Sequence, residues 1–123
     1  MPDLPKRILL VEDEPALREI LRLLFADEAD YELVEATSID GAVAALSGQP
    51  FQLILADGFS STPVGVPGAT APLREAAGKT PVVLLTAHAI PVDEALAVGF
   101  AAVISKPFDL EALLAQVRAL LAM

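Results

Sequence analysis

Three acidic residues follow two apolar runs, at positions where their carboxylates could share one cation. Glu12 and Asp13 come directly after the run Ile8–Val11. Asp57 closes a second run, Phe51–Ala56. If these runs are neighbouring parallel strands, their carboxyl ends lie at one edge of a sheet, which is where open α/β sheets bind ligands. Like charges this close repel by roughly 4 kcal/mol per contact at partial burial, so we expect a cation among them, and Mg2+ prefers such oxygen ligands.

Two further polar residues stand at the ends of apolar runs. Thr86 ends the run Pro81–Thr86, and Lys106 follows the short run Ala102–Ser105. Pro107 comes next, and it restricts the backbone just after the lysine. Taken singly, each of these residues has an ordinary explanation, because an acidic residue after a strand often caps the next helix and a lone lysine is usually a solvated charge. Together, five polar residues at one sheet edge indicate a functional site.

The elements that must position these residues alternate along the chain. The apolar runs without alternation are typical of strands covered on both faces, whereas Tyr31–Ala36 alternates and is expected at an edge of the sheet. Helical patterns separate the runs, which gives the order strand–helix five times over. This order predicts an α/β fold, a doubly wound parallel sheet with helices on both faces.

The helices are marked by their caps and apolar stripes. Pro15 suits the first turn of one helix, Ser38 caps a second that ends at Gly48, and Asp109 caps the last. The predicted apolar stripes are Leu17, Ile20, Leu21 and Leu24 in the first helix, Ala42, Val43 and Leu46 in the second, and Leu110, Leu113, Leu114, Val117, Leu120 and Leu121 in the last. Two weaker helix candidates are residues 69–78 and 91–98. Between them and the strands, the stretch 58–72 is rich in Gly, Pro, Ser and Thr and is expected to be an irregular loop beside the site.

Composition excludes several classes of function. The net charge is −9, from 17 acidic and 8 basic residues, so the basic footprint that direct nucleic-acid binding or an anionic membrane requires is missing. The chain contains no cysteine and is expected to be cytoplasmic. We expect residues 1–123 to form a single domain with no output domain. The hydrophobic content of 54% makes a homodimer reasonable.

The ordered set of motifs resembles the receiver domain of two-component response regulators, over essentially the whole chain. The matching segments are Ile8–Pro15, Phe51–Asp57, Val83–Ala87 and Lys106–Phe108. The resemblance implies a flavodoxin-like three-layer α/β/α fold with a five-stranded sheet in the order 2-1-3-4-5. It also implies phosphorelay signalling, in which a histidine kinase or phosphotransfer protein phosphorylates Asp57 and the domain then signals to a downstream protein. Such a domain is not a turnover enzyme.

The resemblance also assigns roles to the residues of the site. Asp57 is the phospho-acceptor, Lys106 pairs with a phosphoryl oxygen, and the Thr86 hydroxyl donates to another. The implied Mg2+ ligands are the carboxylates of Glu12, Asp13 and Asp57 and the backbone carbonyl of Phe59. Little covalent work falls to the protein, because positioning and charge stabilisation suffice for phosphoryl transfer.

The chain departs from the receiver pattern in the parts that report phosphorylation. Val103 stands where receivers usually carry an aromatic residue, three positions before the lysine. Pro91 falls where the fourth helix should begin, so that helix is expected to be a single turn or absent. Phe59 and His88 occupy positions that flank the path of the hydrolytic water in the family. We therefore expect both residues to affect the lifetime of the phosphoryl group, and a Phe59→Asn variant that dephosphorylates at the parent rate would contradict this.

Three other functions compete with a phosphorylated receiver. A pseudo-receiver would bind a partner without being phosphorylated; the divergent loop and Val103 favour it, whereas the retained site residues disfavour it. A phosphatase of the haloacid dehalogenase type needs a second carboxylate two residues after its nucleophile, where this chain has Phe59. A flavodoxin-like nucleotide binder needs a phosphate loop after the first strand, and the acidic run 12–14 would repel phosphate there. The cognate kinase, the output and the oligomeric state stay open.

Overall fold

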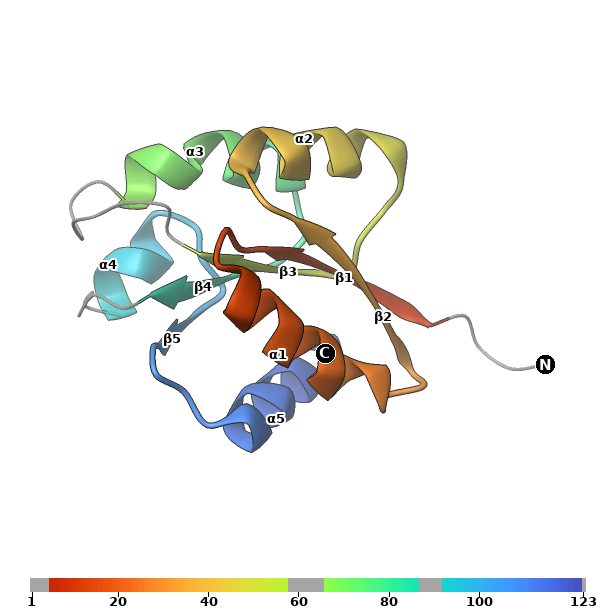
Figure 1. Ribbon diagram of the computed structural model, residues 1–123. Coiled ribbons are helices and arrows are strands. Elements are labelled where there is room, and N and C mark those ends of the chain that lie inside the picture. Colours follow the sequence, from red (N-terminus) through yellow and green to blue (C-terminus); the bar gives the residue numbers. More distant parts are fainter. Residues whose placement is uncertain (1–4, 58–65, 87–91, 123) are drawn as a thin grey trace.

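Strands and helices alternate in the computed structural model, which describes residues 5–57, 66–86 and 92–122 (Figure 1). The strands are β1 (Lys6–Val11), β2 (Tyr31–Ala36), β3 (Leu53–Asp57), β4 (Val82–Thr86) and β5 (Ala102–Ser105). The helices are α1 (Pro15–Ala26), α2 (Ile39–Gly48), α3 (Val66–Ala77), α4 (Val92–Ala97) and α5 (Leu110–Leu121). Among the described residues, no helix is both long enough and apolar enough to cross a membrane.

The five strands form one parallel sheet in the order β2-β1-β3-β4-β5. This confirms the predicted flavodoxin-like fold, including the position of the alternating strand β2 at an edge. The chain runs outward from β1 to β2 and then crosses back to β3, so the strand order reverses between β1 and β3. Ligands of open α/β sheets bind in the crevice at such a reversal, outside the carboxyl ends of the strands.

Each face of the sheet has its own apolar core. Alternate residues of β1 show the division, because Leu9 and Val11 pack with α2, α3 and α4, whereas Ile8 and Leu10 pack with α1 and α5. Figure 1 shows the same layers, with α2 and α3 over one face and α1 and α5 over the other. All four of these β1 side chains are fully buried. A strand buried on both faces must be apolar throughout, so polar groups of use to a ligand are confined to its ends.

Most helix boundaries agree with their sequence signals. Ser38 accepts a hydrogen bond from the Gly41 amide at the start of α2, and Asp109 accepts from Glu111 and Ala112 at the start of α5. The prediction for Ile20 was wrong, since its side chain is 45% exposed. It lies at the margin of the buried stripe of α1, where it lines a groove of about 530 Å³ together with Leu17, Pro107, Phe108 and Leu110.

Helix α3 begins earlier than its sequence predicts. The stretch 58–72 was expected to be an irregular loop, but the helix already begins at Val66; residues 58–65 lie outside the described part. The helix also continues past Pro72, although a proline inside a helix removes one backbone hydrogen bond. The helix continues because Leu73 and Ala77, which follow Pro72, are buried in the core. Their burial stabilises the helical conformation. Helix α4 is short, as predicted, while Pro91 lies outside the described residues.

The cap of α5 supports the loop that carries Lys106, and its contribution to stability can be measured. The Asp109 carboxylate accepts hydrogen bonds of 2.8 and 3.4 Å from two amides of the first helical turn. We expect Asp109→Ala to lower the free energy of unfolding by about 1 kcal/mol, because those amides lose their partner. Urea denaturation followed by circular dichroism measures this. Asp109→Asn keeps a capping oxygen and should lose less; equal losses in the two variants would contradict the capping role.

Candidate functional site

The register of the sheet brings the predicted site residues to one edge. Val11 of β1 pairs with Ala56 of β3, so Glu12 and Asp57 are the next residues along their chains. Asp57 in turn pairs with Leu85 of β4, which places Thr86 one step further on.

The lysine reaches the same edge through β5. Thr86 pairs with Ser105, so Lys106 is the first residue beyond the paired part of β5. Its backbone amide donates to the Thr86 carbonyl at 2.7 Å, which fixes the start of the loop, and the Lys106–Pro107 peptide bond is cis. The five predicted residues therefore lie together at the carboxyl ends of four strands, β1, β3, β4 and β5.

The three predicted acidic residues form a compact cluster. Glu12, Asp13 and Asp57 each offer a carboxylate oxygen, and these oxygens all lie within 4.8 Å of one another. The three groups differ in exposure: Glu12 is buried, Asp57 is half-buried and Asp13 is exposed. The cluster thus runs from the protein interior to solvent, and an incoming group can approach it from the Asp13 side.

Lys106 supplies the positive charge among these carboxylates. Its Nζ lies 2.8 Å from Glu12 Oε1 and 3.5 Å from Asp57 Oδ1. Burial by itself would lower the pKa of Lys106, but the hydrogen bond that Lys106 donates to Glu12 and the charges of Asp57 and Glu12 outweigh it and raise that pKa. The lysine is therefore held in its charged form. Sequence reasoning expected a cation here, and in the structure the protein itself provides one.

Glu12 is the most constrained member of the cluster. Its side chain is 1% exposed, and both carboxylate oxygens have partners, since Oε1 accepts from Lys106 and Oε2 accepts from the Glu14 amide at 3.2 Å. Burial raises the pKa of Glu12, and the charge of Asp57 adds to this rise, while the bonds from Lys106 and the Glu14 amide oppose it. A buried carboxylate is costly unless it is paired and hydrogen-bonded, and here it is both.

Of the remaining predicted residues, the structure describes Thr86 and Val103. Thr86 is 2% exposed at the end of β4. It follows Leu85, which pairs with Asp57 of the acidic cluster. Val103 is half-buried and packs against the core on the side of α2, α3 and α4. Phe59, whose carbonyl is an expected metal ligand, and His88 both lie outside the described residues.

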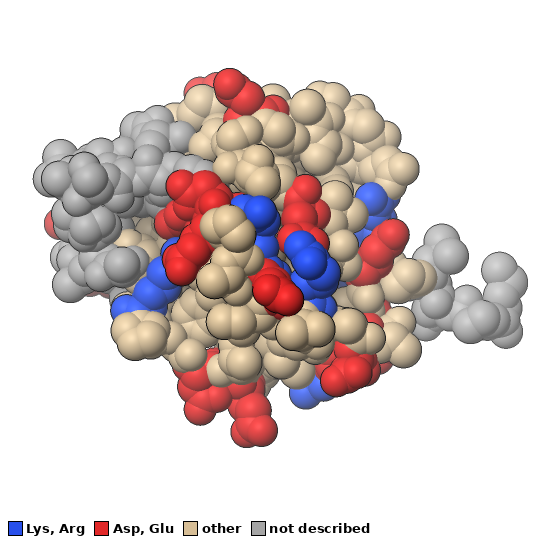
Figure 2. Space-filling view, in the orientation of Figure 1, with Lys and Arg blue, Asp and Glu red and all other residues tan. Residues whose placement is uncertain are grey.

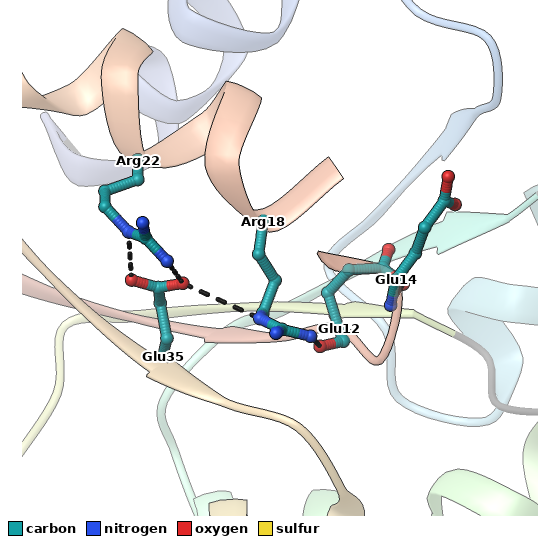
Figure 3. A network of polar contacts seen from close by, with 5 residues as sticks. All are labelled: Glu12, Glu14, Arg18, Arg22 and Glu35. Atoms are coloured by element: carbon teal, nitrogen blue, oxygen red, sulfur yellow. Dashed lines mark hydrogen bonds and ion pairs between the residues drawn. The ribbon is translucent and has the colours of Figure 1, made fainter. Parts of the chain in front are cut away.

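Sequence reasoning missed a second layer of charges behind the cluster. Arg22 makes two hydrogen bonds to Glu35, of 2.8 and 2.9 Å, and Arg18 Nε lies 3.8 Å from the same carboxylate (Figure 3). Arg18 also donates to the backbone carbonyl of Glu12 at 3.1 Å. The available signal was the spacing of the two arginines, which places them on one face of α1, opposite a glutamate on an alternating strand.

The surface view agrees with this arrangement. Figure 2 shows acidic and basic side chains mingled across the middle of the face that α1 and β2 present. Arg18 and Arg22 of this face are both paired with Glu35, and the basic side chains in this view form no continuous patch of the kind that binds nucleic acid.

The donor set of the cluster fits a hard divalent cation. All three groups in it are carboxylates, and Mg2+ is bound in proteins by one or two carboxylates together with water and phosphate oxygens. Because Asp13 is exposed and Asp57 half-buried, the site leaves room for ligands that the protein does not supply. The residues present therefore suit Mg2+.

Fold and site together define a doubly wound, flavodoxin-like α/β domain with an acidic cluster and a lysine at its strand ends. A family model, the response regulator receiver domain, matches residues 8–118. The chain belongs to this family, whose members act in two-component signalling.

Curated relatives share about a third of the sequence. The uncharacterized transcriptional regulatory protein YkoG of Bacillus subtilis is 34% identical over 121 residues, covering 93% of this chain and 50% of the relative. The transcriptional regulatory protein TcrA of Mycobacterium tuberculosis is 34% identical over 123 residues, covering 93% of this chain and 45% of the relative. The chain thus spans about half the length of the curated relatives it matches.

Solved structures share the fold. The receiver domain of a sensor histidine kinase from Pseudomonas aeruginosa, crystallised with a magnesium ion in its active site cleft, matches with a TM-score of 0.78 at 24% identity, covering 97% of this chain and 99% of that one. A response regulator from Thermotoga maritima matches with a TM-score of 0.81 at 20% identity, covering 98% of this chain and all of that one (100%).

The charge layer behind the cluster should leave a pH signature in stability. The hydrogen bond from Arg22 lowers the pKa of Glu35 below its ordinary value of 4.5. A group whose folded-state pKa is lowered stabilises the fold above its unfolded pKa and loses that contribution as pH falls through the folded value. We therefore expect Glu35→Gln to be less stable than the parent at neutral pH, with the difference shrinking below pH 4.5.

Thermal unfolding of both proteins from neutral to acidic pH tests this expectation. The comparison between variant and parent cancels the acidic groups that both share. A stability difference that stays constant across the whole range would contradict the assignment of the lowered pKa to Glu35.

Proposed function

We propose that this receiver domain accepts a phosphoryl group on Asp57 and signals the change to a protein partner. The observation that supports this most directly is the position of Lys106, whose Nζ lies within 3.5 Å of the Asp57 carboxylate in a cluster of three acids. Phosphoryl transfer needs a nucleophile, a fixed cation near the transferred oxygens and room for a metal ion. This edge of the sheet offers all three.

In the proposed reaction an Asp57 carboxylate oxygen attacks phosphorus of a phosphohistidine on the kinase or phosphotransfer protein. The new O–P bond gives an acyl phosphate, and the P–N bond breaks with its electron pair going to the imidazole of the donor. Lys106 offsets negative charge on the phosphoryl oxygens, and the Thr86 hydroxyl donates to one of them. Phosphorylation adds charge beside buried groups, and movement of Thr86 and Lys106 toward it would pass the signal to the elements behind them.

Glu12, Asp13 and Asp57 are the carboxylates that would hold Mg2+ in this proposal, with the Phe59 carbonyl as a further ligand. When bound, the ion would neutralise charge on the phosphoryl group. The all-carboxylate cluster and the magnesium ion in the Pseudomonas receiver domain of the same fold support this assignment.

The same contacts favour a phosphorylated receiver over a pseudo-receiver. A binding module that is never phosphorylated has no need for a buried Glu12 carboxylate, which costs stability unless it is paired. Here the cost is met by Lys106 and the Glu14 amide, in an arrangement that serves phosphoryl transfer.

We further propose that residues 1–123 act as a single cytoplasmic domain whose partners are proteins. Upstream is a histidine kinase or phosphotransfer protein, and downstream is a protein that reads the phosphorylated state. The curated relatives are named transcriptional regulatory proteins, but a domain with a net charge of −9 is poorly suited to contact DNA itself. The domain consumes one phosphoryl group per signal and is not a turnover enzyme.

Phosphorylation can be tested with a small donor. We expect incubation with acetyl phosphate and Mg2+ to add one phosphoryl group to the parent, detected by intact mass, and none to Asp57→Asn. Chelation by EDTA should block the addition. Because small donors can be poor substrates, a panel of histidine kinases is the second donor; an unmodified parent with both donor types would overturn the proposed function.

Metal binding gives a separate test. We expect Glu12→Gln and Asp13→Asn each to weaken Mg2+ binding at least about tenfold, measured by isothermal titration calorimetry, because each removes a charged ligand. Glu14→Gln is the matched control, since it makes the same charge change in the same loop outside the carboxylate cluster. Equal weakening in all three variants would mean that net charge, rather than ligation, governs the affinity.

A further inference from the structure

Arg18 is held in a defined position between the edge strand and the acidic loop. Its side chain is only 18% exposed, although arginines of surface helices are usually solvated. Nη1 donates to the Glu12 carbonyl at 3.1 Å, and Nε faces the Glu35 carboxylate at 3.8 Å. Figure 3 shows the guanidinium lying between these two acceptors. Arg18 therefore links β2 to the first residue of the site.

Glu12 is held through its backbone as well as its side chain. Its amide donates to the Ala36 carbonyl of β2 at 3.0 Å, and its carbonyl accepts from Arg18. The carboxylate is bound by Lys106 and by the Glu14 amide. The contact from Arg18 thus fixes the peptide plane that follows Glu12, and this plane leads directly into Asp13.

Glu35 lies on β2 and faces both arginines of α1. Arg22 donates to both of its oxygens, whereas Arg18 approaches the same carboxylate only to 3.8 Å. The two arginines are four residues apart on α1 and share Glu35, and of the two it is Arg18 that donates to the Glu12 carbonyl (Figure 3).

We propose that Arg18 is a positioning residue that orients Glu12 and Asp13 for a divalent cation. The inference rests on the proposed metal site and adds to it a residue that touches neither the metal ion nor the phosphoryl group. Partners in the layer behind a metal site commonly change metal affinity by tenfold or more when they are removed. Arg18 would act on Glu12, an expected metal ligand, through the backbone carbonyl of that residue and not through its carboxylate.

Charge repulsion alone and the proposed positioning role predict opposite changes in Mg2+ affinity when Arg18 is replaced. Arg18 is a cation close to a cluster that would bind another cation, so removing its charge should strengthen Mg2+ binding through reduced repulsion. If Arg18 acts by positioning, removal should weaken binding instead. The sign of the change therefore separates the two explanations.

The test compares Arg18→Met with Arg22→Met. Both variants remove one positive charge from the same face of α1, and both keep a flexible side chain of similar length. We expect the Mg2+ dissociation constant, measured by isothermal titration calorimetry, to rise about tenfold in Arg18→Met and to stay close to the parent value in Arg22→Met. Arg18→Lys keeps a donor and should recover part of the affinity.

A second measurement needs no metal ion. The Glu14 amide donates to Glu12 Oε2, so its exchange with solvent, followed by NMR on the metal-free protein, reports the geometry of the acidic loop. We expect faster exchange in Arg18→Met than in Arg22→Met, with thermal unfolding showing that both variants are folded. If Arg18→Met does not fold, Arg18→Lys takes its place in both measurements.

The outcomes separate this inference from the proposed function. Unchanged or tighter Mg2+ binding together with unchanged Glu14 exchange in Arg18→Met would overturn the positioning role, even if the parent is phosphorylated normally. Equal loss of affinity in the two methionine variants would also overturn it. If the parent binds no Mg2+ but Glu14 exchange rises only in Arg18→Met, the positioning of the loop stands and the proposed metal site falls.

Discussion

The structure depends on accommodating the buried carboxyl group of Glu12 beside that of Asp57. Glu12 is 1% exposed and close to Asp57, and such a pair repels strongly where water is excluded. Lys106 resolves this by contacting both groups. For its Nζ to arrive there, β5 must lie next to β4 in the observed register, which ties the far side of the sheet to the acidic loop after β1.

The parallel sheet determines where such chemistry can occur. Because helices cover both faces, the strands inside the sheet are largely apolar, and β1 buries four consecutive side chains. Charged groups of these inner strands lie where the strands begin or end, whereas the edge strand β2 carries Glu32 and Glu35 along its length. The carboxyl ends of all strands point the same way, and the strand order reverses between β1 and β3, the two strands that Glu12 follows and Asp57 ends. Fold and site thus follow from one pattern of burial.

The elements that would report phosphorylation are held by contacts between distant parts of the chain. Helix α4 has six residues, too few to be stable alone in water. Ala95 anchors it in the core, and Arg74 of α3 donates to the Val98 carbonyl at 2.6 Å just after it. The Arg74 guanidinium also lies over the Phe100 ring, 5.4 Å from the ring centroid. A helix of this length, held in the described residues by Ala95 and by the contact of Arg74 with Val98, is well suited to respond to small movements nearby.

The sequence by itself determined the order of elements, the strand ends that carry Glu12, Asp57 and Lys106, and the caps at Ser38 and Asp109, because these depend on local pattern and residue type. Only the tertiary structure decided three other features. Helix α3 continues past Pro72 because the burial of Leu73 and Ala77 in the core outweighs the loss of one backbone hydrogen bond. Ile20 is exposed because the packing of α1 on the sheet buries the side of the helix that carries Leu21 and Phe25. The contact of Arg18 with Glu12 joins groups whose sequence shows no link, since only the pairing of β1 with β2 and the packing of α1 bring Glu35, Arg18 and the acidic loop together.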